Sequence, residues 1–351
     1  MSRPSAFRLW ILIWAAPLGL WAQSPPPDAQ TAAQVDRQQA IEAITQEILS
    51  IFEHSRQAVI RIEAIDTNGP LAGTGFFVDA NGTLFTSYTV GGESQEIVVC
   101  QKNTRHPARR LTADRRTGIA ILKVDAHTPF LPSGNTRQLH MASPVIALGY
   151  PMDLPLTPSF GTIGGFDFQH LGRFFAVFHI RANLPVQRGE GGSPLLNMNG
   201  EVVGMLIASL DSGSAAFALP IEAAEKVHRD YLRFGEIRHG WIGLHVASSP
   251  EPQSGSHARI DETVHNGPAQ KAGLQKDDVL LQIGTRKIVE IEDVLDACFY
   301  LTASDPVPVR VARDHREIEL SLLPEDHPLH SETRPPRPRL PSGIPVNSIV
   351  P

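Results

Sequence analysis

The chain has 351 residues, enough for two domains plus tails, and its 42% hydrophobic and 19% charged residues are typical of a globular protein. The formal net charge is −6, and removal of residues 1–22 would take away Arg3 and Arg8 but no acid, giving −8. This negative balance disfavours nucleic acid and anionic membrane surfaces as partners, so neither is expected.

Residues 1–22 have the composition of a secretory signal. Arg3 and Arg8 precede the 14-residue run "LWILIWAAPLGLWA", which is followed by the polar stretch "QSPPPDAQ". Such a run is short for a membrane-spanning helix, so we expect cleavage after Ala22 and a periplasmic or secreted protein. An uncleaved anchor is the alternative, because Leu20 is larger than the residue favoured three places before cleavage.

In the next 300 residues the spacing of apolar side chains changes from helical to strand-like. We expect residues 23–54 to be a linker and an N-terminal helix, since 32–53 is rich in helix formers with apolar residues at helical spacing. Between 55 and 234, short Val-, Ile- and Phe-rich segments recur at intervals of roughly ten residues, separated by Gly, Asn, Asp and Pro. This cadence predicts antiparallel barrels or a sandwich, closed by a helix at 221–234.

A second unit is predicted at 238–323. It contains a helix at 291–302 and a final strand pair in "VPVRVARDHREIELSLL", so we expect an α+β domain. From Pro324 to the end the sequence is rich in Pro and polar residues, which predicts a disordered tail. Cys100 and Cys298 are expected to be free thiols in different domains. No metal-ligand cluster, phosphate loop or cofactor fingerprint is present, so no metal or cofactor is predicted.

Three motifs of the first domain resemble those of the HtrA (high-temperature-requirement) family, whose members join a trypsin-like double barrel to a PDZ domain. They are "GTGFFVDANGTLFTSYTV", "DRRTGIAILKV" and "GEGGSPLLN". The resemblance covers roughly residues 55–323 and implies a mostly β fold. It also implies positions for a catalytic triad. The histidine position falls on Thr89, the aspartate position on Gly118 and the nucleophile position on Gly191.

These three residues cannot perform triad chemistry. A serine hydroxyl needs an imidazole to take its proton, and the imidazole needs a carboxylate to orient it. Glycine supplies none of these groups, and a threonine hydroxyl is no base near pH 7. The resemblance does leave Gly189 and Gly191, whose backbone N–H groups would form the remnant of an oxyanion hole. We therefore expect a serine pseudoprotease without hydrolytic activity, and we interpret Thr89 as a strand residue.

Ser193 is the alternative nucleophile. To place Ser193 at the nucleophile position, the segment would have to shift by two residues against the family motif, which it otherwise matches without a gap. Ser193 would also need a base from outside the three motifs. We expect instead that Ser193 is a turn or strand-start residue bonded to nearby backbone. Glu190 is expected to be an exposed loop carboxylate rather than a substitute catalytic acid.

The second unit resembles a PDZ domain. The segment Trp241, Ile242, Gly243 and Leu244 is similar to the PDZ loop that receives a peptide's terminal carboxylate. The strand from Leu244 to Val246 would pair with the peptide backbone, and the helix 291–302 would form the other wall of the groove. "GPAQKAGLQKDDVLLQI" resembles a further PDZ segment, with Asp277 in place of the usual glycine.

The resulting hypothesis is an inactive HtrA-like protein of the cell envelope. It would bind unfolded or C-terminal peptides as an adaptor, holdase or regulator. The resemblance alone implies a homotrimer or a mixed oligomer with an active relative. Two alternatives stay open: an active serine endopeptidase that uses Ser193 with a non-standard base, and a structural scaffold.

Overall fold

The computed structural model describes residues 27–101, 104–170, 173–210 and 213–326. The predicted signal and most of the predicted tail therefore lie outside the described residues. The chain divides into two compact units, with the boundary between residues 47 and 48. The helix α1 (Pro27–Ser55) begins earlier than the sequence pattern indicates, and its last turns belong to the second unit, where Ile51 is buried in the core.

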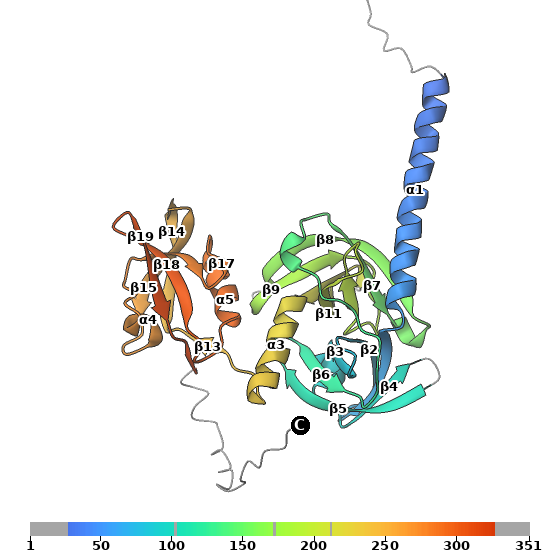
Figure 1. The fold of residues 1–351 in the computed structure, drawn as a ribbon, viewed down its shortest axis with the longest axis horizontal. Coiled ribbons are helices and arrows are strands. Elements are labelled where there is room, and N and C mark those ends of the chain that lie inside the picture. Colours follow the sequence, from blue (N-terminus) through green and yellow to red (C-terminus); the bar gives the residue numbers. More distant parts are fainter. Residues whose placement is uncertain (1–26, 102–103, 171–172, 211–212, 327–351) are drawn as a thin grey trace, which may run out of the picture. The chain divides into compact units, whose positions relative to one another are not determined.

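The predicted double barrel is confirmed (Figure 1). In the first barrel the strand order is β1-β2-β3-β6-β5-β4, all antiparallel pairs. These strands are β1 (Val59–Asp66), β2 (Gly69–Phe77), β3 (Thr83–Ser87), β4 (Glu96–Gln101), β5 (Thr104–Asp114) and β6 (Ile119–Lys123). Their inward side chains form an apolar core around Ile60, Ile62, Phe77 and Leu122. Each barrel closes on itself, because the first and last strands in its order pair with each other.

The second barrel has the order β10-β11-β12-β9-β8-β7. Its strands are β7 (Pro144–Gly149), β8 (Thr157–His170), β9 (Arg173–Asn183), β10 (Pro194–Leu196), β11 (Val202–Leu210) and β12 (Ala215–Pro220). Two short 3₁₀ segments, Thr136–Gln138 and Pro151–Asp153, flank β7. The helix α3 (Ile221–Phe234) has the predicted bounds and ends at Gly235, whose φ of 72° provides the left-handed cap.

The PDZ domain follows, with the sheet order β14-β15-β16-β18-β19 and β17 beside β16. Its strands are β13 (Gly240–Trp241), β14 (Leu244–Gln253), β15 (Ser256–Thr263), β16 (Val279–Ile283), β17 (Arg286–Lys287), β18 (Val307–Arg313) and β19 (Arg316–Leu322). Its helices are α4 (Pro268–Lys271) and α5 (Ile291–Phe299), the latter shorter than predicted. The strand β20 (Glu325–Asp326) pairs with β13, so these two residues of the predicted tail are ordered.

Candidate functional site

The loop before β10 is shaped by two glycines with left-handed backbone. Gly189 has a φ of 99° and Gly192 a φ of 91°, and a Cβ atom at Gly192 would collide with the carbonyl oxygen of Thr74. Thr74 of β2 fixes the loop, because its N–H donates to the Gly191 oxygen at 3.0 Å and its hydroxyl to the Gly189 oxygen at 2.9 Å. Among the described residues, the N–H groups of Gly189 and Gly191 have no backbone acceptor. They are therefore available to an incoming carbonyl.

The structure brings Thr89 and Gly191 together. A Cβ atom added at Gly191 would lie 3.1 Å from Oγ of Ser87 and 3.7 Å from Oγ1 of Thr89. These two hydroxyls are hydrogen-bonded to each other at 2.9 Å. Two segments that are about 100 residues apart in sequence thus meet at one point, where the described side chains nearest to Gly191 are those of Ser87 and Thr89.

The interpretation of Thr89 as a strand residue is wrong. The strand β3 ends at Ser87, and Thr89 lies exposed on the short helix α2 (Tyr88–Gly91). The chain turns here because Val90 packs directly over Gly73, whose missing Cβ leaves room for the valine methyl groups. The helical turn points Val90 into the barrel and leaves Thr89 in solvent.

Gly118 lies beside the same helical turn, since its carbonyl oxygen accepts the N–H of Tyr88 at 2.6 Å. Its φ of 78° is in the left-handed region. A Cβ atom at this position would face Ile207 of β11 at 3.5 Å. The third predicted position is thus near the other two in the fold, but its backbone conformation suits glycine.

Ser193 is fully buried, with an exposed fraction of 0%, and its Oγ has no hydrogen-bond partner within the described residues. The hydroxyl points toward β7, because a Cβ atom at Gly149 would collide with it. The predicted bond to nearby backbone is therefore wrong for this side chain, although its N–H donates to the Glu190 oxygen at 3.0 Å. A nucleophile needs both access and a base, whereas the Ser193 hydroxyl is buried and no described residue is hydrogen-bonded to it.

Glu190 is buried, with 2% of its surface exposed, so the expectation of an exposed loop carboxylate is wrong. Its Oε2 accepts the N–H of Gln187 at 2.5 Å. Burial raises the pKa of this carboxyl group, although that hydrogen bond favours the ionised form. The sequence motif held no signal for this burial, because it results from the way the loop folds back against Gly149.

Two histidines pack against phenylalanine rings: His179 is buried in the second barrel, and His228 of α3 is half-buried. His179 stacks on Phe175 with ring centroids 4.1 Å apart, and its Nδ1 lies 2.9 Å from the Val177 oxygen. Burial lowers the pKa of His179 to about 4. His228 packs edge-on against Phe85, and burial lowers its pKa as well. Both rings are neutral at pH 7 and serve the core.

The predicted carboxylate-binding loop of the PDZ domain turns at Gly243. Gly243 has a φ of 70°, and the Trp241 ring packs 3.1 Å from the place a Cβ atom would occupy there. The carbonyl oxygens of Ile242 and Gly243 accept N–H groups from Ala269 and Val264, both at 2.9 Å. In the described part of the chain, the N–H groups of Ile242 and Gly243 have no backbone acceptor, so they are available to an anion.

The strand β14 and the helix α5 lie next to each other beyond this loop. Among the described strands β14 pairs only with β15, so its outer edge can accept a further strand. Leu244 and Val246 alternate on β14 and are partly buried against the PDZ core, as are Ile291 and Cys298 of α5. The groove residues predicted on β14 are thus brought together with α5 as expected.

Known proteins match both halves of the chain. A trypsin-like peptidase domain matches residues 73–205, and a PDZ domain matches residues 240–323. The chain belongs to the HtrA family. A "probable periplasmic serine endoprotease DegP-like" from Chlamydia trachomatis is 27% identical over 71% of this chain and 53% of its own length. A protein of the same description from Pseudomonas fluorescens is 28% identical over 72% of this chain and 57% of its own length.

Solved structures of the HtrA family agree in fold. The HtrA-type protease AlgW with a tripeptide superposes with a TM-score of 0.66 at 21% identity, covering 80% of this chain and 97% of that one. The crystal structure of a serine endoprotease from Yersinia pestis superposes with a TM-score of 0.56 at 22% identity, covering 80% of this chain and 98% of that one. The chain spans about half the length of the curated HtrA relatives it matches. Within the described residues, no helix is long and apolar enough to cross a membrane.

Proposed function

We propose that this HtrA chain is a pseudoprotease of the cell envelope that binds peptides without cleaving them. One observation carries the proposal: Thr89 and Gly191 meet at the predicted catalytic point, and neither has a group that can act as base or nucleophile. Loss of a triad serine or histidine alone costs on the order of a million-fold in turnover. The free N–H groups of Gly189 and Gly191 would still receive a peptide carbonyl.

The PDZ groove is the second support. Its loop would receive a terminal carboxylate, and its apolar walls suit peptides with apolar side chains at alternate positions. We assign to this groove the binding of unfolded envelope proteins or their C-termini, as an adaptor, holdase or regulator. The named relatives are periplasmic, which supports an envelope location. A homotrimer, or a mixed oligomer with an active relative, is part of the same proposal.

The test has two arms. Purified protein is incubated with labelled casein, beside the variant Thr89→His/Gly118→Asp/Gly191→Ser. We expect no release of label from the wild type. Degradation by the wild type that Ser193→Ala abolishes would overturn the proposal in favour of an active endopeptidase.

Binding is followed with C-terminal peptides by the emission of Trp241, the only tryptophan after residue 22. We expect saturable changes that Gly243→Val removes, because a branched side chain strains the left-handed loop and meets the Trp241 ring. Absence of binding to any C-terminal peptide, together with unchanged interactions in the Gly243 variant, would favour a structural scaffold.

A further inference from the structure

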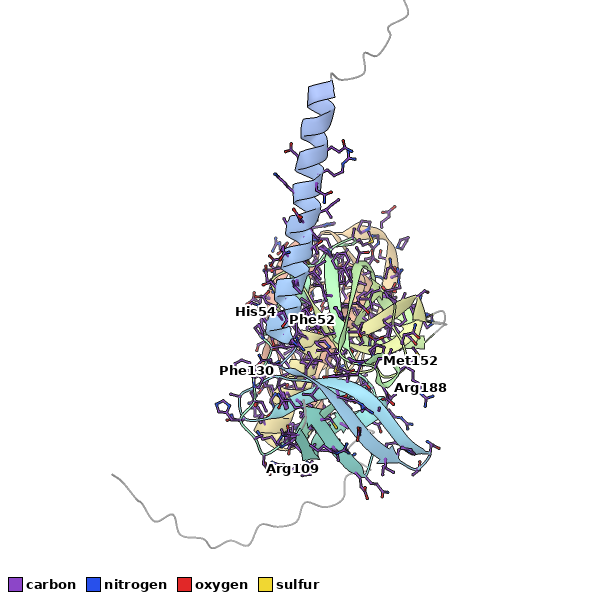
Figure 2. The ribbon with its side chains drawn as sticks, turned by 90° about the vertical axis from the view of Figure 1, so that its right-hand side faces the viewer. Phe52, His54, Arg109, Phe130, Met152 and Arg188 are labelled. Atoms are coloured by element: carbon purple, nitrogen blue, oxygen red, sulfur yellow. The ribbon has the colours of Figure 1, made fainter. Side chains whose placement is uncertain are left out.

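A concavity of about 460 Å³ lies between α3 and the first barrel, and its size is in the range of small-molecule sites. Side chains of β3, β5, β6 and the β2–β3 turn line one side of it, and side chains of α3 line the other. We call it the α3 pocket. Figure 2 shows Arg109, which lines this pocket, well apart from Met152 and Arg188, which lie beside the loop that begins at Gly189. The α3 pocket is therefore a different surface from that loop.

Three neighbouring strands place a row of polar side chains along one side of the α3 pocket. Thr83 of β3 lies directly opposite Lys123 of β6, and Lys123 in turn lies opposite Arg109 of β5. Directly opposed residues of antiparallel strands share one face of the sheet, so the two cations lie next to each other. Like charges in this arrangement destabilise a sheet. An anion bound between the two side chains would remove that cost.

Neither of these two cations is neutralised by an ion pair. Arg109 is exposed and has no ion pair or hydrogen bond with any other residue that the structure describes. Lys123 is half-buried, and its Nζ lies 3.4 Å from the Thr83 hydroxyl, which carries no charge. Both ammonium and guanidinium groups therefore have donors to spare on the side of the pocket.

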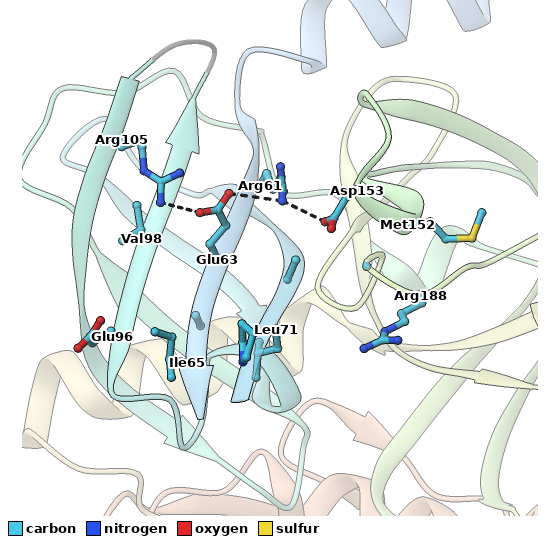
Figure 3. Close-up of a pocket in the computed structure, with 14 residues that line it drawn as sticks. Arg61, Glu63, Ile65, Leu71, Glu96, Val98, Arg105, Met152, Asp153 and Arg188 are labelled. Carbon is cyan, nitrogen blue, oxygen red and sulfur yellow. Dashed lines mark hydrogen bonds and ion pairs between the residues drawn. The ribbon is translucent and has the colours of Figure 1, made fainter. Parts of the chain in front are cut away.

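The other described arginines of β1 and β5 already have partners. In the cleft beside the Gly189 loop, Arg105 pairs with Glu63 at 2.6 Å, Glu63 with Arg61 at 3.4 Å, and Arg61 with Asp153 at 3.1 Å (Figure 3). Arg110 donates to two backbone carbonyl oxygens at 3.1 and 2.9 Å. The unpaired charge of these strands is thus concentrated in the α3 pocket.

Asp79 is the one acid among the described residues that line the pocket. Its Oδ1 accepts the backbone N–H groups of Asn81 and Thr83, at 2.8 and 3.0 Å, so this carboxylate holds the β2–β3 turn in place. Two cations and one carboxylate give the lining a charge of +1, because the His228 ring is neutral at pH 7. A positive site on a chain with a net charge of −6 selects an anion.

Three neutral groups add further donors. The side chains of Asn81 and Tyr231 line the pocket and have no hydrogen bond with the rest of the described chain. His228 packs edge-on against Phe85 and also lines the pocket, and a neutral imidazole carries one N–H donor. A carboxylate offers only two oxygens to these five groups, whereas a phosphate ester offers at least one more. The lining therefore matches a phosphate group better than a carboxylate.

Two leucines give the pocket an apolar side. Leu232 of α3 is 69% exposed, and Leu111 of β5 lines the same concavity. The register of β5 against β6 shifts between Arg110 and Thr112, so Leu111 is the extra residue of a β-bulge. Bulges redirect side chains and are frequent beside functional sites. An exposed leucine at the rim of a concavity suits the organic part of a ligand.

We propose that the α3 pocket binds a phosphate group carried by a small organic molecule. The phosphate lies between Arg109 and Lys123, and the organic part contacts Leu232. Asn81, Tyr231 and His228 donate to the remaining phosphate oxygens. A soluble phosphate ester and the headgroup of a phospholipid present the same chemistry to this pocket. The site goes beyond the proposed function and does not depend on it, because it shares no residue with the triad positions or the PDZ loop.

The experiment is isothermal titration calorimetry of the full chain with inorganic phosphate, glycerol phosphate and glycerate. We expect saturable binding of both phosphate compounds and at least tenfold weaker binding of glycerate, which carries a carboxylate instead. Arg109→Gln and Lys123→Gln should each weaken phosphate binding at least tenfold, and Tyr231→Phe about fivefold, since it removes one hydrogen bond. Affinity should fall as salt is added.

Arg116→Gln is the matched control, because Arg116 is an exposed arginine of the same barrel that does not line the pocket. Circular dichroism verifies that each variant is folded. Equal losses in the control and in Arg109→Gln, equal affinity for glycerate, or no binding of any phosphate probe would overturn the site.

Sedimentation with vesicles identifies the source of the phosphate. Retention on phosphatidylglycerol but not on phosphatidylcholine vesicles, lost in Arg109→Gln, would support the site with a lipid headgroup as its ligand. Binding of glycerol phosphate without such retention would support it with a soluble ester. Retention that Arg109→Gln leaves unchanged, without binding of the soluble probes, would overturn it. Degradation of casein by the same protein would refute the pseudoprotease and leave these outcomes unaffected.

Discussion

Replacement of Ser193 by alanine should stabilise the protein. The hydroxyl group is fully buried and has no partner among the described residues, so folding removes it from water without compensation. A buried unsatisfied hydroxyl costs about 1–3 kcal/mol. Alanine keeps the Cβ atom and removes only the oxygen that faces Gly149. We therefore expect Ser193→Ala to raise the free energy of unfolding by about 1–2 kcal/mol.

Ser94→Ala provides a matched control. Ser94 is also buried, but its Oγ donates to the Val90 oxygen at 2.6 Å. Its removal should lower the free energy of unfolding by about 1 kcal/mol, the net value of a satisfied hydrogen bond. Urea unfolding followed by far-ultraviolet circular dichroism measures both. A loss of stability in Ser193→Ala as large as that in the control would refute the reasoning, because it would mean that the hydroxyl has a partner.

Three further predictions concern the site and its support. Burial raises the pKa of the Glu190 carboxyl group in the folded state. The stability that this group contributes is therefore complete below its unfolded pKa near 4.5 and is lost as the pH rises through the folded pKa. We expect Glu190→Gln to resist urea better than the wild type at pH 8 but not at pH 4. Gly118→Ala should cost about 1–2 kcal/mol in the same assay, because its φ of 78° is left-handed. Lys226→Met should cost about 3–5 kcal/mol by leaving the buried Asp230 carboxylate without its ion partner. Lys226→Met/Asp230→Asn should recover part of that loss in thermal unfolding, because the amide is uncharged and its oxygen can still accept the Arg238 N–H.

The fold could be predicted where local pattern and final structure agree. The helix at 221–234 has apolar residues at helical spacing, begins after Pro220 and ends at Gly235, so local sequence predicts both of its ends. The strand pair at the end of the PDZ domain is joined by Asp314 and His315, both left-handed as a tight hairpin requires. In these segments the local sequence is enough to predict the secondary structure, because packing in the core favours the same conformation.

The site could be located but not described from the sequence. Thr89 lies in a sequence of strand formers, yet it is helical because Val90 can pack over the glycine of a neighbouring strand. Glu190 and Ser193 have the residue types of an exposed turn, and both are buried against β7. Burial of a loop depends on which distant residues cover it, and this information is absent from a window of nine residues.

The three positions that the family resemblance assigns to a triad are not equivalent in backbone and surroundings, and under the proposed function the difference decides how far triad chemistry could be restored. Gly191 has no left-handed φ, so a serine there meets only the tight 3.1 Å approach to Ser87. Thr89 is exposed on its helix and leaves room for an imidazole. Gly118 is different, because its left-handed backbone directs a side chain toward Ile207, so an aspartate there meets both a strained φ and an apolar neighbour. The carboxylate of a triad contributes less to turnover than the nucleophile or the base. Nucleophile and base are therefore the positions that the scaffold could regain most readily, and the orienting acid is the one whose return carries a backbone cost of about 1–2 kcal/mol.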